Sequence, residues 1–286
     1  MKNRAIIFGD SGFIGRPLIE KLKEDHEVIG ISRHSLKNSH NHINLDLSNI
    51  ECKSYLKKLI TDFNPNFIFH YAANPLVKDY TVEVSQNNII STHILLDSLT
   101  PECRLVFASS ATVYGDHSIV RTVLDKTNPS SVYGMAKVYC EDLIKYYFSI
   151  KKLRSYCIIR YTAHLGKSAS HGLIFDILNK LKSGSEYLEL FGNSPGAIKP
   201  YLHIEDSIKA TIYHAYNRYG IHNIGPRDNI SVLEVAQTIM NELDIHKEIK
   251  WTGQSWPGDN QYVEVFSDYP VRSSKQAIID YARTLK

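Results

Sequence analysis

Ala5-Ile-Ile-Phe8-Gly9-Asp-Ser-Gly12-Phe-Ile-Gly15 is the stretch of this chain that decides the fold. A short apolar run leads into a loop with glycine at every third position, and a helical pattern begins near Ile14. A strand, such a loop and a helix N-terminus in this order can bind the pyrophosphate of a dinucleotide. Glycines can also be plain turn residues, but the flanking elements favour a cofactor. We therefore expect cofactor contacts from Gly9, Ser11, Gly12, Phe13, Ile14 and Gly15. The carboxylate of Asp10 is expected to point away from the phosphates.

The first half of the chain alternates strand-like and helix-like segments. Strands are expected at 5–8, 27–31, 43–45, 66–70, 104–108 and 155–160, and helices at 14–23, 48–63, 82–99 and 132–151. This alternation predicts an α/β fold with a Rossmann-type, doubly wound parallel sheet covered by helices on both faces. Phe67-Ile68-Phe69 is apolar throughout, as a strand buried on both faces requires.

After about Gly166 the pattern loosens, and glycine, serine and proline become frequent. We expect residues 1–165 to form an NAD(P)-binding Rossmann domain, with segments near 201–225 returning to it. Residues 166–286 are expected to form mainly a smaller C-terminal substrate-binding lobe. Within that lobe Ser231-Val-Leu-Glu234 predicts a helix start, because serine and glutamate at this spacing form a capping box.

The composition excludes several classes of protein. With 33 basic and 30 acidic residues among 286 and no basic run, neither nucleic acid nor a membrane is expected as a partner. No apolar run reaches ~18 residues, and Met1-Lys2-Asn3-Arg4 leads straight into the first strand, which predicts a cytoplasmic protein without a signal peptide. The four cysteines have no metal or redox spacing, so reduced, buried thiols are expected. His34, His40 and His42 are interpreted as part of a solvated loop, not as metal ligands.

Tyr133-Gly-Met-Ala-Lys137 carries the candidate chemistry. A tyrosine and a lysine four residues apart lie on one face of a helix. The lysine charge favours the phenolate and is expected to lower the pKa of Tyr133 from its ordinary ~10, while Ser110 could hold the reacting oxygen. Such a trio can move a proton at an alcohol or carbonyl oxygen, but it cannot accept a hydride. A cofactor must therefore accept the hydride. Taken alone, the pair could also be an ordinary surface pair of a helix.

The end of the second strand bears on the choice of cofactor. A carboxylate there would bind the ribose 2′-hydroxyl of NAD, whereas an arginine accommodates the 2′-phosphate of NADP. This chain has Ser32-Arg33, which favours NADP over the alternative, NAD, although Arg33 could also be a plain surface residue. Asp46 is either an adenine contact or a cap with Ser48. Ligands bind at the carboxyl ends of parallel strands, so we expect further cofactor contacts from Asp46, Leu47, Tyr71, Ala72 and Ala73.

These motifs together resemble the extended short-chain dehydrogenase/reductase family, the nucleotide-sugar epimerases and dehydratases, over almost the full length. The matching motifs are the glycine loop, His70-x-Ala72-Ala73, Asn88, Ser109-Ser110-Ala-Thr-Val-Tyr114-Gly115, Tyr133-x-x-x-Lys137, Asn223-x-Gly225 and Ser231-Val-Leu-Glu234. The resemblance implies that Tyr133 is the catalytic acid/base, that Lys137 also holds the nicotinamide ribose and that Ser110 binds the reacting oxygen. It further implies that Asn88 supports the cofactor site, that Thr112 lies at the substrate, and that the chain forms a homodimer through helices 82–99 and 132–151.

The residues after Ser110 separate the chemistries of this family. The 4,6-dehydratases carry an Asp-Glu pair where this chain has Ala111-Thr112, and enzymes of the fucose-synthase type carry a cysteine at Thr112, so neither reaction is expected. The expected reaction is NADPH-dependent reduction of a 4-keto nucleotide sugar, which Arg33 favours. The alternative is an NAD-dependent 4-epimerase similar to UDP-galactose 4-epimerases, which the serine-rich motif favours. A dinucleotide sensor without turnover is a third possibility, but it has no need of the intact trio.

The substrate region departs from the family pattern. The family's Arg-Asp pair, whose arginine grips the substrate diphosphate, is replaced by Lys199-Pro200. Lys199 could still neutralise a phosphate, but only as a point charge. The family's Asn-x-Tyr-Gly-Pro segment reads Ala163-His-Leu-Gly166-Lys, which removes the asparagine contact.

Overall fold

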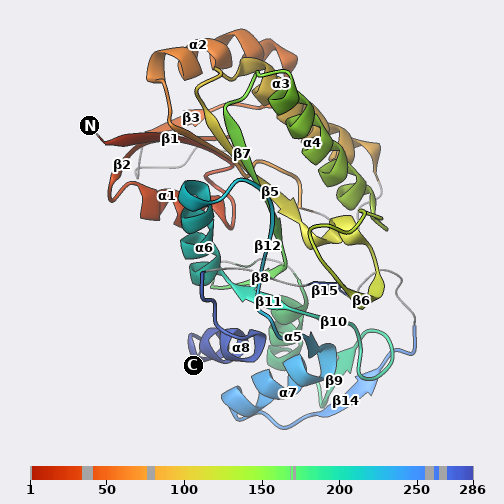
Figure 1. Cartoon of the computed structure of the whole chain (residues 1–286). Helices are drawn as coiled ribbons and strands as arrows, with labels where there is room; N and C mark the ends of the chain where they lie inside the picture. The colour runs from red at the N-terminus through yellow and green to blue at the C-terminus, as the bar shows by residue number, and fades with distance from the viewer. Residues whose placement is uncertain are drawn as a thin grey trace.

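The computed structural model shows a parallel sheet with helices on both faces and a smaller lobe beside its carboxyl edge (Figure 1). It describes residues 2–33, 41–75, 81–167, 169, 172–254, 261–263 and 269–285. The seven strands follow the order β3-β2-β1-β4-β5-β7-β12, and every neighbouring pair is parallel. Their bounds are Asn3–Phe8 (β1), His26–Ser32 (β2), His42–Asn44 (β3), Phe67–His70 (β4), Arg104–Ser110 (β5), Ser155–Tyr161 (β7) and Gly220–Ile224 (β12). The predicted doubly wound sheet is confirmed, with its switch point between β1 and β4.

Two groups of helices cover the two faces of the sheet. One face carries α1 (Gly15–Leu22) and α6 (Ile204–Asn217), and the other carries α2 (Lys53–Phe63), α3 (Val82–Ser98) and α4 (Val132–Ser149). Side chains alternate along a strand, so Ile6 and Phe8 of β1 pack toward the second group while Ala5 and Ile7 pack toward the first. Each central strand is therefore apolar on both faces, as its sequence predicts.

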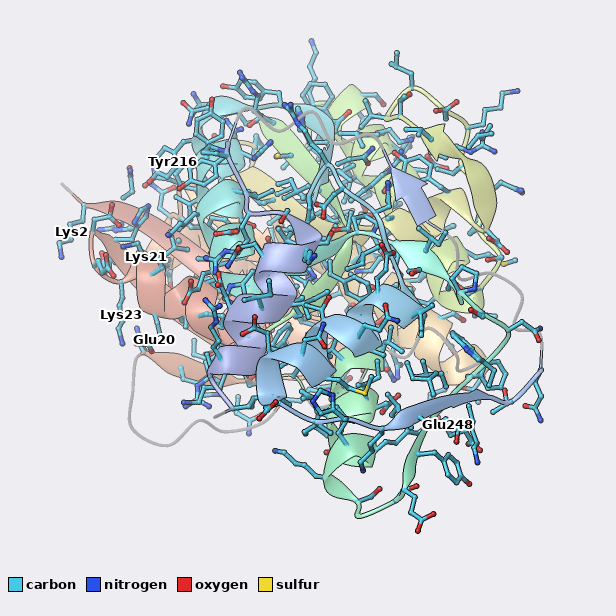
Figure 2. All side chains as sticks on the ribbon, turned by 90° about the horizontal axis from the view of Figure 1, so that it is seen from below. Lys2, Glu20, Lys21, Lys23, Tyr216 and Glu248 are labelled. Atoms are coloured by element: carbon cyan, nitrogen blue, oxygen red, sulfur yellow. The ribbon has the colours of Figure 1, made fainter. Side chains whose placement is uncertain are left out.

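Helix α1 shows why such segments fold against the sheet. Its inner side consists of the fully buried Leu18, Ile19 and Leu22. Its outer side carries Glu20 and Lys21, which point away from the ribbon, as does Lys23 just past the helix end (Figure 2). Apolar residues at helical spacing thus attach the helix directly after the glycine loop.

The smaller lobe has its own apolar core around α5 (Leu173–Lys182), α7 (Val232–Leu243) and α8 (Ser274–Arg283). The remaining strands form two-stranded pairs: Ala163–Leu165 (β8) with Tyr201–His203 (β11), Tyr187–Leu190 (β9) with Glu248–Trp251 (β14), Ile198–Lys199 (β10) with Ile230–Ser231 (β13), and His117–Arg121 (β6) with Gln261–Val263 (β15). The predicted capping box of α7 is confirmed, because Ser231 Oγ accepts from Glu234 N at 3.2 Å and Glu234 accepts from Ser231 N at 2.9 Å.

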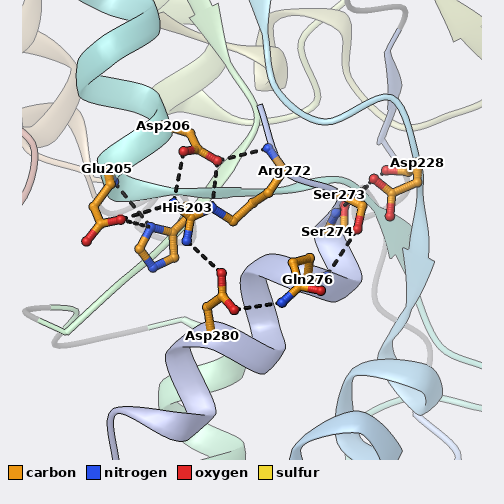
Figure 3. Close-up of polar contacts among 9 residues, drawn as sticks. All are labelled: His203, Glu205, Asp206, Asp228, Arg272, Ser273, Ser274, Gln276 and Asp280. Atoms are coloured by element: carbon orange, nitrogen blue, oxygen red, sulfur yellow. Dashed lines mark hydrogen bonds and ion pairs between the residues drawn. The ribbon is translucent and has the colours of Figure 1, made fainter. Parts of the chain in front are cut away.

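Arg272 joins this lobe to the main sheet (Figure 3). Its guanidinium binds both oxygens of Asp206 at 2.8 and 3.0 Å, Glu205 at 3.0 Å and Asp280 at 2.7 Å. Asp206 and Glu205 lie in the first turn of α6, and Asp280 lies on α8. One arginine therefore ties the segment before α8 to a helix of the sheet.

The strands and helices expected in the first half of the chain all appear, with small shifts of their ends. The segment expected as a helix from residue 48 begins with a 3-10 turn, Ile50–Cys52, before α2. The short paired strands were not predicted, because two to five residues carry too little periodicity to distinguish a strand from a loop.

Candidate active site

The glycine loop after β1 lies directly against the segment after β4. Gly9 has φ +86°, and a Cβ there would sit 2.7 Å from the carbonyl carbon of Tyr71 and from the nitrogen of Ala72, so only glycine fits. Backbone bonds from Gly9 N to Ile31 O (2.7 Å) and from Tyr71 N to Phe8 O (2.8 Å) hold both segments. Helix α1 has no side-chain cap and no acidic residue in its first turn, which leaves its positive end for an anionic group. The cradle fits a pyrophosphate.

Asp10 in this loop is turned into the interior. It is 0% exposed, and its Oδ2 lies 2.7 Å from Nδ1 of His42 at the start of β3. The prediction that His42 belongs to a solvated loop is wrong, because β3 pairs with β2 and brings the imidazole under the glycine loop. His34 and His40 lie outside the described residues.

The edge formed by β2 and β3 carries a cation and a carboxylate. Ser32 is buried at the end of β2, and Arg33 is exposed beside it. Asp46 accepts from the nitrogen of Ser48 at 2.9 Å and from its hydroxyl at 2.7 Å. Burial opposes ionisation of Asp46, but the Ser48 bonds and the charge of Arg33 outweigh it and lower the pKa of that carboxyl. Asp46 therefore caps the turn with Ser48, while its adenine contact stays a prediction.

The turn after Ser110 and the start of the helix that carries Tyr133 pack closely against each other. Ser110 ends β5, and its Oγ accepts from the nitrogen of Thr112 at 3.2 Å in the turn Ala111–Tyr114 (η2). Ser131 caps α4 by accepting from Gly134 N at 3.1 Å. A Cβ on Gly134 would lie 2.8 Å from the carbonyl oxygen of Thr112, so this glycine lets α4 approach η2 closely. Within the described chain the buried Thr112 Oγ1 has no hydrogen-bond partner, which suits a site that receives a polar ligand.

Lys137 is buried one helical turn after Tyr133. It is 4% exposed, its Nζ donates to the carbonyl oxygen of Ala108 at 2.6 Å, and it lies 5.6 Å from the centre of the Tyr133 ring. Burial lowers the pKa of Lys137 to about 8, although Cys140 and Glu141 act in the opposite direction. The lysine therefore still carries a proton at neutral pH, next to the tyrosine as the spacing predicts.

The expected direction of the Tyr133 pKa is not observed. Burial raises the pKa of Tyr133 to about 12, because the phenolate loses its hydration, and the Cys140 thiol acts in the same direction. The Lys137 ammonium is bound to the Ala108 carbonyl instead of the phenol. No residue in the described ranges hydrogen-bonds the Tyr133 hydroxyl. Tyr133 is thus protonated at neutral pH, with its hydroxyl available to a substrate oxygen.

Asn88 and His70 support the segment after β4. The Asn88 side chain accepts from Asn74 N at 2.7 Å and donates to Asn74 O at 3.1 Å. His70 is bonded through Nε2 to the Thr92 hydroxyl at 3.0 Å, and Thr92 donates to the backbone oxygen of Asn88 at 2.9 Å. Burial and the charge of Lys137 lower the pKa of His70 to about 3, so it is neutral. Asn88 therefore holds the loop that carries the expected cofactor contacts, while its own contact with a cofactor stays a prediction.

A buried polar network behind the trio was missed in the sequence. It joins Glu141 of α4, Ser109 of β5, Arg160 of β7, Tyr114 of η2 and Asn223 of β12, all at most 4% exposed. The available signal was the spacing of Glu141, four residues after Lys137 and so on the same face of the helix. A buried carboxylate needs a cation, but the sequence does not say which one.

The substrate side presents residues that the family pattern does not contain. Lys199 lies in the smaller lobe, half-buried, with its ammonium 6.0 Å from the Tyr201 ring. His164 lies edge-on to Phe13 of the glycine loop with ring centres 6.4 Å apart, and its Nε2 is 2.7 Å from the Ser207 hydroxyl. Burial lowers the pKa of His164 to about 4. A neutral imidazole therefore borders the glycine loop beside the position of the missing asparagine.

The described ranges give three further observations. No group of three or more His, Cys, Asp or Glu side chains in them could hold a metal ion. Of the helices in that part of the chain, none is long and apolar enough to cross a bilayer. All four cysteines are free and buried, as their spacing predicts.

Comparison with known proteins gives consistent matches. Residues 5–225 match the NAD dependent epimerase/dehydratase family. An ADP-L-glycero-D-manno-heptose-6-epimerase of Brachyspira hyodysenteriae is 27% identical over 261 residues, covering 82% of this chain and 79% of that protein. A solved UDP-galactose 4-epimerase is 26% identical with a TM-score of 0.82, covering 99% of this chain and 98% of its own. The Thermus thermophilus UDP-glucose 4-epimerase, solved in complex with NAD, is 19% identical with a TM-score of 0.81, covering 98% and 99%, and shows the shared fold.

The parallel sheet with helices on both faces is the fold of Rossmann-type α/β proteins of the epimerase class. The chain belongs to the NAD-dependent epimerase/dehydratase family. The matched region, residues 5–225, includes the glycine loop, the trio and all seven strands of the sheet.

Proposed function

We propose that the chain is a nucleotide-sugar epimerase that inverts one carbinol carbon of a nucleoside-diphosphate sugar by redox-neutral hydride exchange. The observation that carries the proposal is the Tyr133 hydroxyl, to which no described residue hydrogen-bonds, beside the buried Lys137. The next residue, Gly134, packs against Thr112 in the turn that follows Ser110. The neighbouring Ala111 and Thr112 offer no carboxylate for dehydration. The similar ADP-L-glycero-D-manno-heptose-6-epimerase and UDP-glucose 4-epimerases support the same reaction class.

The chain's own residues then divide the work. Tyr133 moves a proton on and off the sugar oxygen, and Ser110 holds that oxygen by a hydrogen bond. Lys137 supplies a buried positive charge that favours the phenolate once the proton has left. A bound nicotinamide dinucleotide supplies the hydride acceptor and donor. Thr112 and Lys199 are proposed to contact the substrate, Lys199 through its diphosphate.

The proposed cofactor is NADP, with NAD as the alternative. The exposed Arg33 and the buried Ser32 end β2, where a 2′-phosphate would lie, and Asp46 is already bonded to Ser48. Two solved structures of this fold, a dTDP-glucose 4,6-dehydratase and a UDP-glucose 4-epimerase, are complexes with NAD, which supports the alternative. The residues proposed to hold the cofactor are Gly9, Ser11, Gly12, Phe13, Ile14, Gly15, Ser32, Arg33, Asp46, Leu47, Tyr71, Ala72, Ala73, Asn88, Tyr133 and Lys137.

The proposal is tested in two steps on the purified protein. The protein is denatured and any released nucleotide is identified by mass spectrometry. Fresh protein is then incubated with UDP-glucose, UDP-galactose or an ADP-heptose, and the products are identified by NMR. We expect two sugar epimers to interconvert without net consumption of NADPH or NADH. Net oxidation of a reduced cofactor in step with product formation would overturn the epimerase.

The second candidate is an NADP-dependent reductase of a 4-keto nucleotide sugar. The pKa of Tyr133, about 12, favours it, because the protonated phenol is ready to donate to a ketone oxygen. In this case a 4-keto sugar would consume one NADPH per turnover, and no epimer would form without it. The absorbance of the reduced nicotinamide separates the two candidates directly.

We also propose a homodimer through α3 and α4. Helix α4 exposes Met135, Tyr139, Tyr146 and Phe148, each more than 40% accessible. Light scattering on a sizing column should give twice the chain mass, and Tyr146→Glu should shift it to the monomer. A monomeric wild-type protein would contradict this assembly.

A further inference from the structure

Three neighbouring strands end in a row of polar side chains behind the active site. Ser109 of β5 is the register partner of Arg160 on β7, and Arg160 is the register partner of Asn223 on β12. Register partners on parallel strands point to the same face of a sheet. Here that row meets Glu141 of α4, so three strands and one helix share one buried cluster.

The bonds in this cluster satisfy its charges. Glu141 Oε1 accepts from Ser109 Oγ at 2.5 Å and from Arg160 Nε at 3.0 Å, and Oε2 accepts from Arg160 Nη2 at 2.6 Å. Arg160 Nη1 donates to the Tyr114 hydroxyl at 2.9 Å, which in turn donates to Asn223 Oδ1 at 2.8 Å. The result is a bidentate ion pair with one arm to β5 and another to η2.

Stability alone does not account for this cluster. A buried ion pair pays a large desolvation penalty, and apolar side chains of similar volume often stabilise a core as well or better. Its position is more informative. Ser109 precedes Ser110, Tyr114 lies two residues after Thr112, and Glu141 lies one turn after Lys137. Each arm ends next to a member of the proton-transfer site.

We propose that Glu141 is a positioning residue of this site. Through Ser109 and the Arg160–Tyr114 arm it fixes Ser110 and η2 against α4, and its carboxylate supplies negative charge next to Lys137. The inference rests on the proposed function, because it assumes that Lys137 acts on the cofactor and on Tyr133.

The charge has a definite expected effect. The titratable groups that face the Lys137 ammonium are Tyr133, Cys140 and Glu141 on α4 and His70 on β4, while β5 contributes the uncharged Ala108 carbonyl and Phe107 ring. Glu141 raises the pKa of Lys137 against the effect of burial. Without that carboxylate, Lys137 loses its proton at a lower pH, so the alkaline limb of any Lys137-dependent process moves to lower pH.

Four variants test the inference. Ser109→Ala removes one bond and keeps the ion pair, and Glu141→Gln removes the charge. The double variant Glu141→Met/Arg160→Met replaces the ion pair with apolar side chains. It keeps the test valid if Glu141→Gln, which leaves Arg160 without its carboxylate, does not fold. Asp142→Asn is the matched control, because Asp142 follows Glu141 but pairs with Lys145 at the exposed side of α4.

The measurements are kcat and KM with the nucleotide sugar, the pH dependence of NADPH binding without sugar (nicotinamide fluorescence), and thermal unfolding. For Ser109→Ala we expect kcat to fall about tenfold or more with KM and unfolding nearly unchanged, since small misplacements are costly in catalysis. For Glu141→Gln and the double variant, the alkaline limb of NADPH binding should move down by about one pH unit. Asp142→Asn should change neither.

The outcomes separate the two proposals. Folded variants with unchanged kcat and an unmoved alkaline limb would overturn the positioning role while leaving the epimerase standing. A wild-type protein that turns over no nucleotide sugar, with the expected shift of NADPH binding in the variants, would overturn the proposed function and leave the role of Glu141 standing.

Discussion

Two arginine clusters of this molecule use the same chemistry in different surroundings. Arg160 is 3% exposed and binds one carboxylate, Glu141, in the interior behind the active site. Arg272 has a 22% exposed side chain and binds Glu205, Asp206 and Asp280 where the smaller lobe meets α6 (Figure 3). The first joins elements within the sheet domain, and the second ties one lobe to the other.

The difference teaches that the number of ion pairs does not measure their importance. When a buried charge loses its partner, no water can take the partner's place, so the free energy of unfolding falls strongly. At a partly exposed cluster, water and the remaining partners compensate, and the net contribution is small. The cluster with fewer pairs is therefore expected to be the more sensitive one.

The largest expected effect tests directly whether the buried arginine cluster matters more for stability than the partly exposed one. Arg160→Met leaves Glu141 buried with only the Ser109 bond and should lower the free energy of unfolding by about 3–5 kcal/mol. Arg272→Met should lower it by only about 1 kcal/mol, since Glu205 and Asp280 reach solvent and the buried Asp206 keeps its bond from the backbone nitrogen of residue 272. Urea unfolding of both variants at one pH measures the two losses. Equal losses would show that burial does not separate the clusters.

The next effect concerns Tyr133, which belongs to neither cluster. Tyr133→Phe should lower kcat by about a thousandfold, because the proton donor at the sugar oxygen is gone. Unfolding should hardly change, since no described residue hydrogen-bonds the hydroxyl. Tyr139→Phe, an exposed tyrosine on the same helix, is the control. A Tyr133→Phe protein with near-normal kcat would remove Tyr133 from the mechanism.

A third effect sharpens the contrast between buried and exposed charge. Burial lowers the pKa of Lys137 from 10.5 to about 8. Between these values the unfolded chain binds more protons than the folded one, so wild-type stability rises with pH through that window. Lys137→Met should therefore be more stable than wild type by about 3 kcal/mol at pH ~7, with the gain vanishing toward pH ~10.5.

Lys137→Met should also lose activity. Urea unfolding of this variant and of the wild type, repeated from pH ~7 to pH ~10.5, measures the difference in stability. Lys145→Met, at an exposed position of α4, should show no such pH-dependent gain. A Lys137→Met protein less stable than wild type at every pH would contradict the cost of burying this charge.

The smallest effect lies at the exposed end of β2. Arg33→Ala should weaken NADPH binding by about tenfold relative to NADH, because the 2′-phosphate loses its cation. Fluorescence titrations with both reduced cofactors measure the ratio, and Arg16→Ala on the exposed side of α1 is a control. An unchanged ratio would leave NAD as the better proposal.

The sequence predicted the elements that are marked by a hydrophobic periodicity or by characteristic turn and cap residues. The glycine loop, the apolar strands and the Ser231 capping box are local signals, and each one corresponds to an observed element. The part of the candidate site that could be predicted consists of residues close in the sequence, such as Tyr133 and Lys137. The missing contacts of the site join different strands: Arg160 carried no local signal, and the Asn223-x-Gly225 motif did not show which residue Asn223 binds.

The sequence by itself therefore determined the fold class, because spacing along a strand or helix fixes which side chains share a face. It also predicted the place of the cofactor cradle and the members of the proton-transfer trio. The tertiary structure alone decided the partner of each buried charge and the direction of the pKa of Tyr133. Both depend on burial and on contacts between distant elements: Lys137 binds the Ala108 carbonyl, Glu141 binds Arg160, and burial raises the pKa of the Tyr133 phenol.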